Sequence, residues 1–155
     1  MLCAEFRGSG KSTWIKNNIQ EKEIVVSRDD IRYSLLKDGE PYFAHEQDVF
    51  NIFCTSIASC LKNYNAVYAD ATHINKKSRS KLIKGLLTTN FNFNEIEKIA
   101  VYFKTPILEC LNRNANRKGR AKVNEGVILD MANNFQPPTE EEYFDKIIIV
   151  GDKNE

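Results

Sequence analysis

The chain has 155 residues, of which 42% are apolar and 28% are charged, and its formal net charge is +1. This length suits one core of ordinary size, so we expect a single domain over residues 1–155. The near-neutral charge excludes a general electrostatic attraction to nucleic acid, and an anionic partner must therefore meet a local group of basic residues.

No apolar run approaches the roughly 20 residues that span a bilayer, and the first residues contain neither a basic leader nor an apolar signal segment. We therefore predict a cytoplasmic protein without a membrane partner. The abundance of asparagine, lysine and isoleucine suggests an AT-rich genome, which indicates a bacterial or phage-infected cell. Cysteine is used sparingly, without a CxxC pair and without a histidine at ligand spacing. We interpret the cysteines as reduced, mostly buried thiols: Cys3, Cys54, Cys60 and Cys110.

Short apolar segments rich in branched residues alternate with helical periodicity along the chain. The predicted strands are 2–4, 23–27, 66–70, 98–103 and 146–150. The predicted helices are 45–62, 78–87, 107–117 and 125–135, the first with a core face that includes Val49, Ile52, Phe53 and Ile57. Such alternation predicts an α/β fold, with a parallel sheet between helices and ligands at the carboxyl ends of the strands.

Residues 5–14, EFRGSGKSTW, match the phosphate-binding pattern G-x-x-x-x-G-K-[ST] except that Glu5 replaces the first glycine. In such a loop the backbone amides and the helix dipole hold phosphate, the lysine reaches the outer phosphates and the serine binds magnesium. The predicted ATP-binding residues here are Gly8, Ser9, Gly10, Lys11, Ser12 and Thr13. Glu5 can crowd the loop and repel phosphate, which leaves open a loop that binds nucleotide poorly.

Charged residues follow the second predicted strand in SRDDIRYSLL, where Ser27 and Asp30 fit a capping box that opens a helix. Asp29 and Arg32 are three residues apart and share a face of that helix. Beside a phosphate loop, the carboxylate can accept a hydroxyl proton and the guanidinium can hold a substrate phosphate. The alternative is an ordinary ion pair on the surface.

The third predicted strand, AVYAD, ends in Asp70, which resembles the second magnesium-supporting motif of phosphate-loop proteins. Thr72 and His73 follow and are expected to lie over the site. For His73 the alternative is a hydrogen-bonded loop residue without a role in chemistry.

A basic segment without acidic residues, LNRNANRKGRAK, occupies residues 111–122. Arg113 and Arg117 are four residues apart and share a helix face, and Gly119 allows the chain to bend beyond them. Arginines on a mobile lid neutralise charge during phosphoryl transfer, so we predict a lid at about 111–124. The alternative is a solvated charged face.

Five motifs together resemble a known family: GSGKSTW, SRDDIR, YADATHIN, LNRNANRKGRAKVN and MANNFQPPTEEEYFDKI. In this order they resemble the small P-loop kinases of the polynucleotide-kinase type, sometimes grouped as AAA-family ATP-binding kinases. The resemblance spans almost the whole chain. It implies an adenylate-kinase-like, three-layer fold with a five-stranded parallel sheet flanked by helices, plus a short basic lid. No DxDGT phosphatase signature is present in the sequence.

The resemblance also implies roles for individual residues. Asp29 matches the general base that acts on a 5′-hydroxyl, and Arg32 matches the arginine that holds the adjoining substrate phosphate. Arg113 and Arg117 match the lid arginines that contact ATP phosphates and stabilise the transition state. The departures from the family pattern are Glu5 for glycine, Arg7 for a frequent proline, His73 for a frequent asparagine and Asn124 for a frequent proline.

We therefore predict an ATP- and Mg²⁺-dependent kinase acting on a hydroxyl group, with the 5′-hydroxyl end of a polynucleotide as the expected acceptor. The predicted catalytic residues are Lys11, Asp29, Arg32, Arg113 and Arg117, and the predicted magnesium-supporting residues are Ser12 and Asp70. Two alternatives stay open. One is a kinase of a small hydroxyl compound, and the other is a nucleotide-binding module with weak catalysis because of Glu5. The sequence leaves the oligomeric state open.

Overall fold

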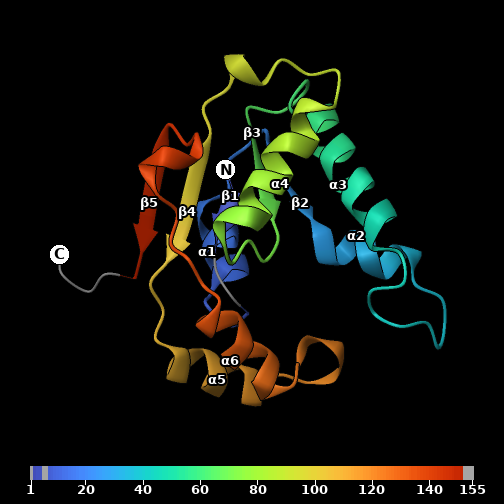
Figure 1. Ribbon diagram of the computed structural model, residues 1–155, viewed down its shortest axis with the longest axis vertical. Helices are drawn as coiled ribbons and strands as arrows, with labels where there is room; N and C mark the ends of the chain where they lie inside the picture. The colour runs from blue at the N-terminus through green and yellow to red at the C-terminus, as the bar shows by residue number, and fades with distance from the viewer. Residues whose placement is uncertain (1, 5–6, 152–155) are drawn as a thin grey trace.

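Two pairs of parallel strands, joined through a short central strand, form the sheet of this protein (Figure 1). The computed structural model describes residues 2–4 and 7–151. The strands are β1 (Leu2–Ala4), β2 (Glu23–Ser27), β3 (Ala66–Asp70), β4 (Ile99–Phe103) and β5 (Lys146–Val150). Their spatial order is β2-β3-β1-β4-β5. The pairs β2–β3 and β4–β5 each match five residues, whereas β1 contributes three residues and touches β3 in register only at Leu2 and Ala69.

The helices follow the strands in the alternation that the sequence predicts, which confirms the α/β class. They are α1 (Lys11–Asn18), α2 (Arg28–Leu35), α3 (Glu46–Cys60), α4 (Lys76–Leu87), α5 (Ile107–Ala115) and α6 (Glu125–Asn133). Single 3₁₀ turns occur at η1 (Phe93–Glu95), η2 (Gly119–Ala121) and η3 (Glu140–Glu142). No helix in the described part of the chain combines the length and apolar character needed to cross a bilayer.

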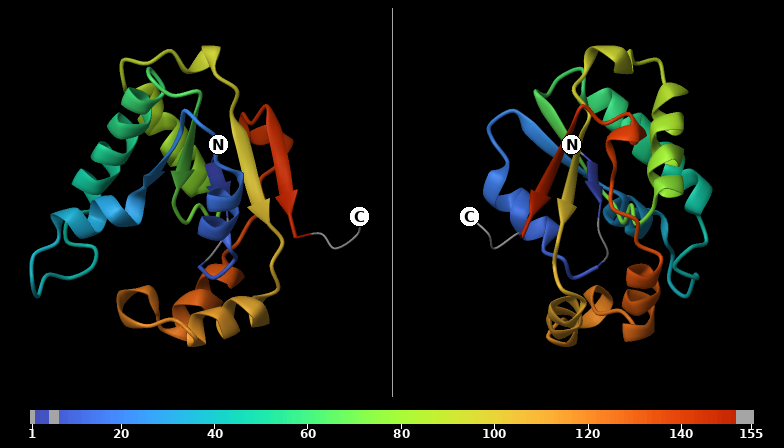
Figure 2. Two further views of the ribbon diagram at one scale, coloured as in Figure 1. Left: turned by 180° about the vertical axis from the view of Figure 1, so that it is seen from behind. Right: turned by 60° about the vertical axis from the view of Figure 1, so that its left-hand side comes forward.

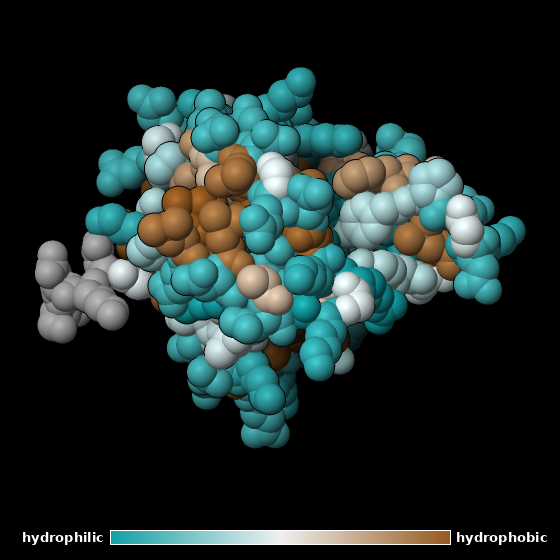
Figure 3. Space-filling view, turned by 90° about the horizontal axis from the view of Figure 1, so that it is seen from below, coloured by the Kyte–Doolittle hydropathy of each residue, from teal (hydrophilic) through white to brown (hydrophobic). Residues whose placement is uncertain are grey.

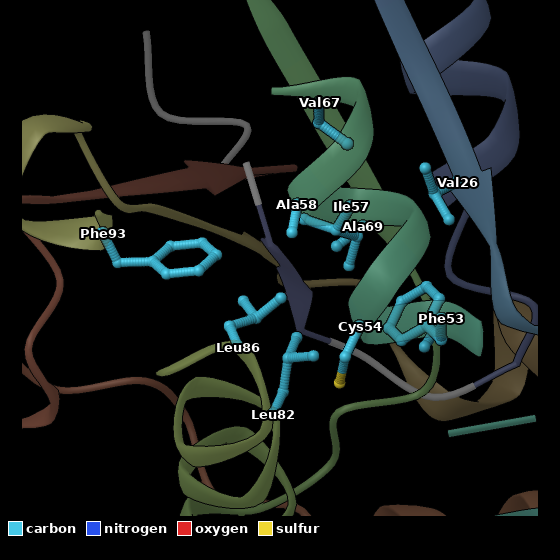
Figure 4. Close-up of a cluster of buried hydrophobic side chains, with 11 residues drawn as sticks. Val26, Phe53, Cys54, Ile57, Ala58, Val67, Ala69, Leu82, Leu86 and Phe93 are labelled. Atoms are coloured by element: carbon cyan, nitrogen blue, oxygen red, sulfur yellow. The ribbon is translucent and has the colours of Figure 1, made fainter. Parts of the chain in front are cut away.

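Successive side chains of a strand point to opposite faces of the sheet. Each face therefore packs against a different set of helices. Val67 and Ala69 of β3 face α3 and α4 and join the larger hydrophobic cluster, part of which is drawn in Figure 4. Tyr68, between them, faces the other way and packs with Ile15 of α1. Burial on both faces explains the continuous apolar run of β3, whereas the edge strands β2 and β5 expose Val25 and Ile149.

The apolar residues of helix α3 form the predicted core face, except for Ile52. Val49, Phe53 and Ile57, at four-residue spacing, are buried against the sheet. Ile52 is 39% exposed, because it lies at the outer edge of the stripe. Cys54 and Cys110 are buried and Cys60 is partly buried. The prediction for the Cys3 side chain lies outside what the structure describes.

Helices α5 and α6 lie together below the carboxyl edge of the sheet, apart from the two covering layers (Figures 1 and 2). A cluster of their own holds them, in which Cys110 and Ile128 are completely buried. The amide of Asn114 also donates to the carbonyl of Val123 at 2.8 Å, which fixes the turn between the two helices. The basic segment is therefore placed at the carboxyl ends of the strands, where the phosphate loop also lies.

Candidate active site

The phosphate loop between β1 and α1 has the backbone that only glycine adopts freely. Gly8 and Gly10 have φ values of 94° and 100°, in the left-handed region. A Cβ at Gly8 would lie 2.8 Å from the carbonyl oxygen of Cys110, so the loop also packs too closely on α5 for a side chain. Helix α1 begins at Lys11, immediately after the loop. The arrangement of strand, glycine loop and helix amino terminus predicted from the sequence is therefore present.

The segment around α5 holds the loop from the outside. Arg113 donates from Nη1 to the carbonyl oxygen of Gly8 at 3.0 Å, and Thr105 donates to the carbonyl oxygen of Ser9 at 2.9 Å. These contacts satisfy the carbonyl oxygens of Gly8 and Ser9 with donors from α5 and the segment before it. The backbone amides of such a loop are the groups that bind an anion.

A cavity of about 140 Å³ opens between the loop and the carboxyl ends of β2 and β3. Its lining comprises Arg7, Gly8, Gly10, Lys11, Ser12, Thr13, Ser27, Asp29, Asp70, Ala71, Thr72 and Arg117. Eight of the predicted site residues therefore meet at one place, although they come from four separate segments. Ser9, Arg32 and Arg113 are predicted site residues outside this lining. Glu5 lies outside the described residues.

A larger cavity, of about 1060 Å³, adjoins the first on the side of β4 and β5. Gly8, Gly10, Thr13 and Arg117 line both cavities, so the two are continuous around the loop. The larger one is also lined by Ser9, Trp14, Tyr102, Phe135 and Arg113. Tyr102 stacks on Phe135 with ring centroids 5.4 Å apart. This pair of rings gives the larger cavity an aromatic wall beside a phosphate loop.

Asp29 lies at the start of α2 with its carboxylate held by three donors. Arg7 Nη2 lies 2.7 Å from Oδ2, and Tyr42 donates its hydroxyl to Oδ1 at 2.8 Å. Arg32 donates to the same Oδ1 from Nη1. The Asp29 side chain keeps 46% of its surface exposed, so the carboxylate is oriented by these partners and still open to the cavity.

Tyr42 is fixed as a donor in this network. Burial first, and then its hydrogen bond to Asp29, raises the pKa of Tyr42 to about 12. The phenol is therefore protonated at neutral pH. Arg7 and Arg32 each donate to its oxygen at 2.9 Å, so the hydroxyl links both arginines to the carboxylate.

Arg32 does not line the cavity, although its expected role as a phosphate ligand would require this. Its side chain is 7% exposed and donates from Nε to Glu46 as well as from Nη1 to Asp29. Burial would lower the pKa of Arg32, but the hydrogen bond to Glu46 and the nearby negative charges raise it overall. In this structure Arg32 holds Asp29 and the start of α3 together.

Asp70 ends β3 inside the cavity, with Ser12 opposite it at the start of α1. Burial raises the pKa of Asp70, and Lys11 opposes this shift. A carboxylate and a hydroxyl are hard oxygen donors of the kind Mg²⁺ prefers, together with phosphate oxygens and water. The donor set therefore fits Mg²⁺ bound with a nucleotide. The described side chains contain no group of three His, Cys, Asp or Glu that could hold a metal by themselves.

The basic segment crosses the site from α5 towards α2 (Figure 2). Arg113 forms an ion pair with Glu109 and holds the loop, while Arg117 lines both cavities. The guanidinium of Arg120, in η2, lies 4.3 Å from the ring centroid of Tyr33 in α2. The segment therefore reaches over the cavity to the helix that carries Asp29.

His73 does not lie over the site, so this expectation was wrong. Thr72 lines the cavity, and the next side chain turns into the protein, where His73 is 2% exposed and packs near Phe53. Neither ring nitrogen of His73 has a hydrogen-bond partner among the described residues, whereas its backbone oxygen accepts from Arg79 at 3.2 Å. Burial first, and then the charges of Arg28, Arg79 and Lys11, lower the pKa of His73 to about 3.

Sequence reasoning missed two groups of residues around the site. The first group is Arg7 and Tyr42, which hold Asp29. The sequence shows Arg7 only as a replacement for a proline that is frequent in the family, and Tyr42 lies in a loop, where no periodic pattern indicates a role. The second group is the buried ion pair of Arg79 and Glu142, whose side chains are 1% and 4% exposed. Arg79 also donates to the backbone oxygens of His73, Gln136 and Pro137. The 63-residue separation of that ion pair left no local signal in the sequence.

Comparisons with known proteins agree with the geometry. Among solved structures, a chain of the Pnkp1/Rnl/Hen1 RNA repair complex superposes with a TM-score of 0.69 and 21% identity, over 86% of this chain and 42% of that chain. A sugar kinase from Janibacter sp. HTCC2649 gives 0.63 and 11% identity, over 96% of this chain and 82% of that one. The tunicamycin resistance protein of Deinococcus radiodurans gives 0.56 and 14%, over 97% and 85%. At these identities the likenesses establish the fold.

The first of these chains is much longer than ours, which spans 42% of its length. None of the curated proteins compared with the chain matches it in sequence. A family model described as an AAA domain matches residues 6–138, from the phosphate loop to the proline pair. The chain therefore belongs to this AAA-domain family.

Proposed function

We propose that this protein is an ATP-dependent kinase that transfers the γ-phosphate to a hydroxyl group. The observation that carries the proposal is the meeting of Lys11, Ser12, Asp29, Asp70 and Arg117 in one cavity. These side chains supply a phosphate-binding cation, magnesium-supporting oxygens, a base and a lid arginine. Such a set matches the requirements of phosphoryl transfer, in which positioning and charge stabilisation provide most of the catalysis.

In the proposed mechanism, ATP lies with its phosphates on the amides of residues 8–13 and its base towards the larger cavity. Asp29 accepts the proton of the attacking hydroxyl, whose oxygen forms a bond to the γ-phosphorus as the bond to the ADP oxygen breaks. Lys11 and Arg117 stabilise the charge on the transferring group. Ser12 and Asp70 would hold Mg²⁺, which would neutralise negative charge on the nucleotide phosphates.

The acceptor we propose is the 5′-hydroxyl end of a polynucleotide. This assignment is supported by the resemblance of the motifs to polynucleotide kinases and by the place of Asp29 in the cavity beside the phosphate loop. The sugar kinase shares the fold, which keeps a small hydroxyl compound as the second candidate acceptor. A binding module with weak catalysis, because of Glu5, is the remaining alternative.

The test is transfer of labelled γ-phosphate from ATP with Mg²⁺ to 5′-hydroxyl RNA, 5′-hydroxyl DNA and a set of small hydroxyl compounds. Lys11→Ala is the inactive control. Lys16→Ala, on the exposed side of the same helix, is the matched control that should stay active. We expect transfer to an oligonucleotide end that Lys11→Ala abolishes. Transfer to small compounds alone would overturn the acceptor, and no transfer with intact ATP binding would favour the module with weak catalysis.

A further inference from the structure

Three aromatic rings gather in the part of the structure next to Asp29. Tyr33 lies on α2, and Tyr42 and Phe43 lie on the loop between α2 and α3. The ring centroids of Tyr33 and Tyr42 are 5.8 Å apart, and those of Tyr42 and Phe43 are 4.7 Å apart, both edge to face. We call these three residues the aromatic shelf.

Arginines hold the aromatic shelf next to the proposed base. The guanidinium carbon of Arg32 lies 4.6 Å from the ring centroid of Tyr42 and 5.5 Å from that of Phe43. The Tyr42 hydroxyl donates to Asp29, so the shelf begins one hydrogen bond from the carboxylate. On the far side, Arg120 of the basic segment covers Tyr33. Tyr33 and Tyr42 therefore both contact other side chains of the protein.

Phe43 is the ring left open, since 67% of its surface is exposed. In the view from below, the largest hydrophobic area lies left of centre, and smaller hydrophobic areas surrounded by hydrophilic residues lie towards the right (Figure 3). Phe43 differs from a scattered surface hydrophobe, because its ring continues a cluster of aromatic side chains that ends at the proposed base and it offers a flat apolar face there.

We propose that the aromatic shelf is a subsite for the terminal nucleobase of a single-stranded nucleic acid, which stacks on Phe43 while its 5′-hydroxyl meets Asp29. This inference rests on the proposed function, because it gives the acceptor of that same site its second point of attachment. The base is one ribose away from the 5′-hydroxyl, and Phe43 is adjacent in sequence to a partner of Asp29.

Stacking on aromatic side chains, combined with cations that follow the backbone, is the way proteins bind single strands without reading their sequence. The chain as a whole has a net charge of only +1, so a local subsite is needed to hold such a ligand. The shelf adds the stacking surface, and Arg120, whose guanidinium lies over Tyr33, adds positive charge beside it. We expect the protein to bind a strand that has any base on its 5′-terminal residue more tightly than a strand that lacks this base.

The test measures equilibrium binding rather than turnover. RNA and DNA single strands with a 5′-hydroxyl and a fluorophore at the 3′ end are titrated with the full chain, and fluorescence anisotropy gives Kd. Each strand has a partner in which the 5′-terminal residue lacks its base. The variants are Phe43→Ala, Phe43→Trp and Leu87→Ala, the last as a matched control because Leu87 is 60% exposed at the end of α4.

We expect Phe43→Ala to weaken binding of the intact strand by about 5-fold to 150-fold, the range for one stacked base. Loss of the terminal base should weaken binding to the native protein equally, and Phe43→Ala should no longer distinguish the two strands. Phe43→Trp and Leu87→Ala should bind as the native protein does. Equal affinity of the native protein for intact and base-free strands, or no binding of either, would overturn the subsite.

The kinase proposal is judged separately, by transfer from ATP. A protein that phosphorylates small compounds and binds no strand would retain the kinase and lose the subsite. A protein that stacks the terminal base on Phe43 but transfers no phosphate would retain the subsite and lose the kinase.

Discussion

Arg7 Nη2 lies 2.7 Å from Asp29 Oδ2, and this contact joins the phosphate loop directly to the proposed base. Both side chains line the cavity that also contains Lys11 and Asp70. A carboxylate offers about four acceptor positions, of which Arg7, Arg32 and Tyr42 occupy three. Asp29 is therefore oriented by its neighbours while one position is left for the hydroxyl that it must deprotonate.

Replacing Arg7 tests whether this contact helps the reaction. Arg7→Ala removes the donor on Oδ2 and one positive charge from the cavity, so kcat should fall by about tenfold to a hundredfold, as expected for loss of a positioning group. Arg7→Lys keeps the charge without the planar fork and should give an intermediate kcat. Steady-state kinetics with the acceptor identified in the transfer assay measures both. A higher kcat in Arg7→Ala would show instead that Arg7 restrains the base.

Asp70→Asn should separate stability from activity. Burial raises the pKa of Asp70 in the folded protein, so the carboxyl contributes fully to stability while it is protonated, and that contribution is lost as the pH rises through the folded pKa. At pH 7.5 without Mg²⁺, the neutral asparagine should therefore raise Tm, by about 2–4 °C for each kcal/mol gained. Phosphate transfer should nearly disappear, because an oxygen that supports the metal is lost.

Thermal unfolding at pH 7.5 and at pH 4 measures the effect, which should shrink at the lower pH. A lower Tm for Asp70→Asn at pH 7.5 would contradict the unfavourable burial of this carboxylate.

The ion pair of Arg79 and Glu142 should contribute far more than a surface pair when one partner is removed. Arg79→Met leaves Glu142 charged and buried, at a cost of about 3–5 kcal/mol in the free energy of unfolding. The double variant Arg79→Met with Glu142→Leu should cost less than the single change, because no unpaired charge is left.

Urea denaturation measures these free energies. Lys98→Met is the matched control, since its partner Asp145 is 50% exposed and such pairs contribute about 0–1 kcal/mol. Similar losses for Arg79→Met and Lys98→Met would contradict the structural role given to the buried pair.

His73 should make the protein sensitive to mild acid. Its pKa is lowered to about 3 in the folded protein, so its contribution to stability is present above the ordinary pKa near 6.5 and is lost as the pH falls below it. Between pH 6.5 and pH 5 the free energy of unfolding should fall by about 1.4 kcal/mol per pH unit. Glu46 and Glu142, whose pKa values are lowered from 4.5, add their losses at lower pH.

The chain contains two histidines, which provides a direct control. His73→Asn should flatten the dependence above pH 5, whereas His45→Asn should leave it, because His45 pairs with Glu40 in the loop before α3 at a partly exposed position. A slope that persists in His73→Asn would assign the acid sensitivity to other groups.

The sequence predicted the parts of this site that follow from local pattern. The glycine loop, the cap at Ser27 and the acid at the end of β3 are each defined within a few residues, and parallel strands bring their carboxyl ends to one edge. Contacts between segments that are far apart in the sequence were not predicted. The distance from Arg120 to Tyr33, the pair of Arg79 and Glu142, and the burial of His73 depend on how helices pack, which periodicity alone does not specify.

In the proposed mechanism, Asp29 accepts the proton of the acceptor hydroxyl during phosphate transfer from ATP. The most direct measurement is the single-turnover rate of transfer for Asp29→Asn, with ATP affinity measured in parallel. Asp30→Asn is the matched control, because Asp30 is the next residue in the same turn of α2 and is exposed. We predict that Asp29→Asn lowers the rate by about 10²-fold to 10⁴-fold and changes ATP affinity only a few fold, while Asp30→Asn behaves as the native protein. A rate for Asp29→Asn close to that of Asp30→Asn would contradict the assignment.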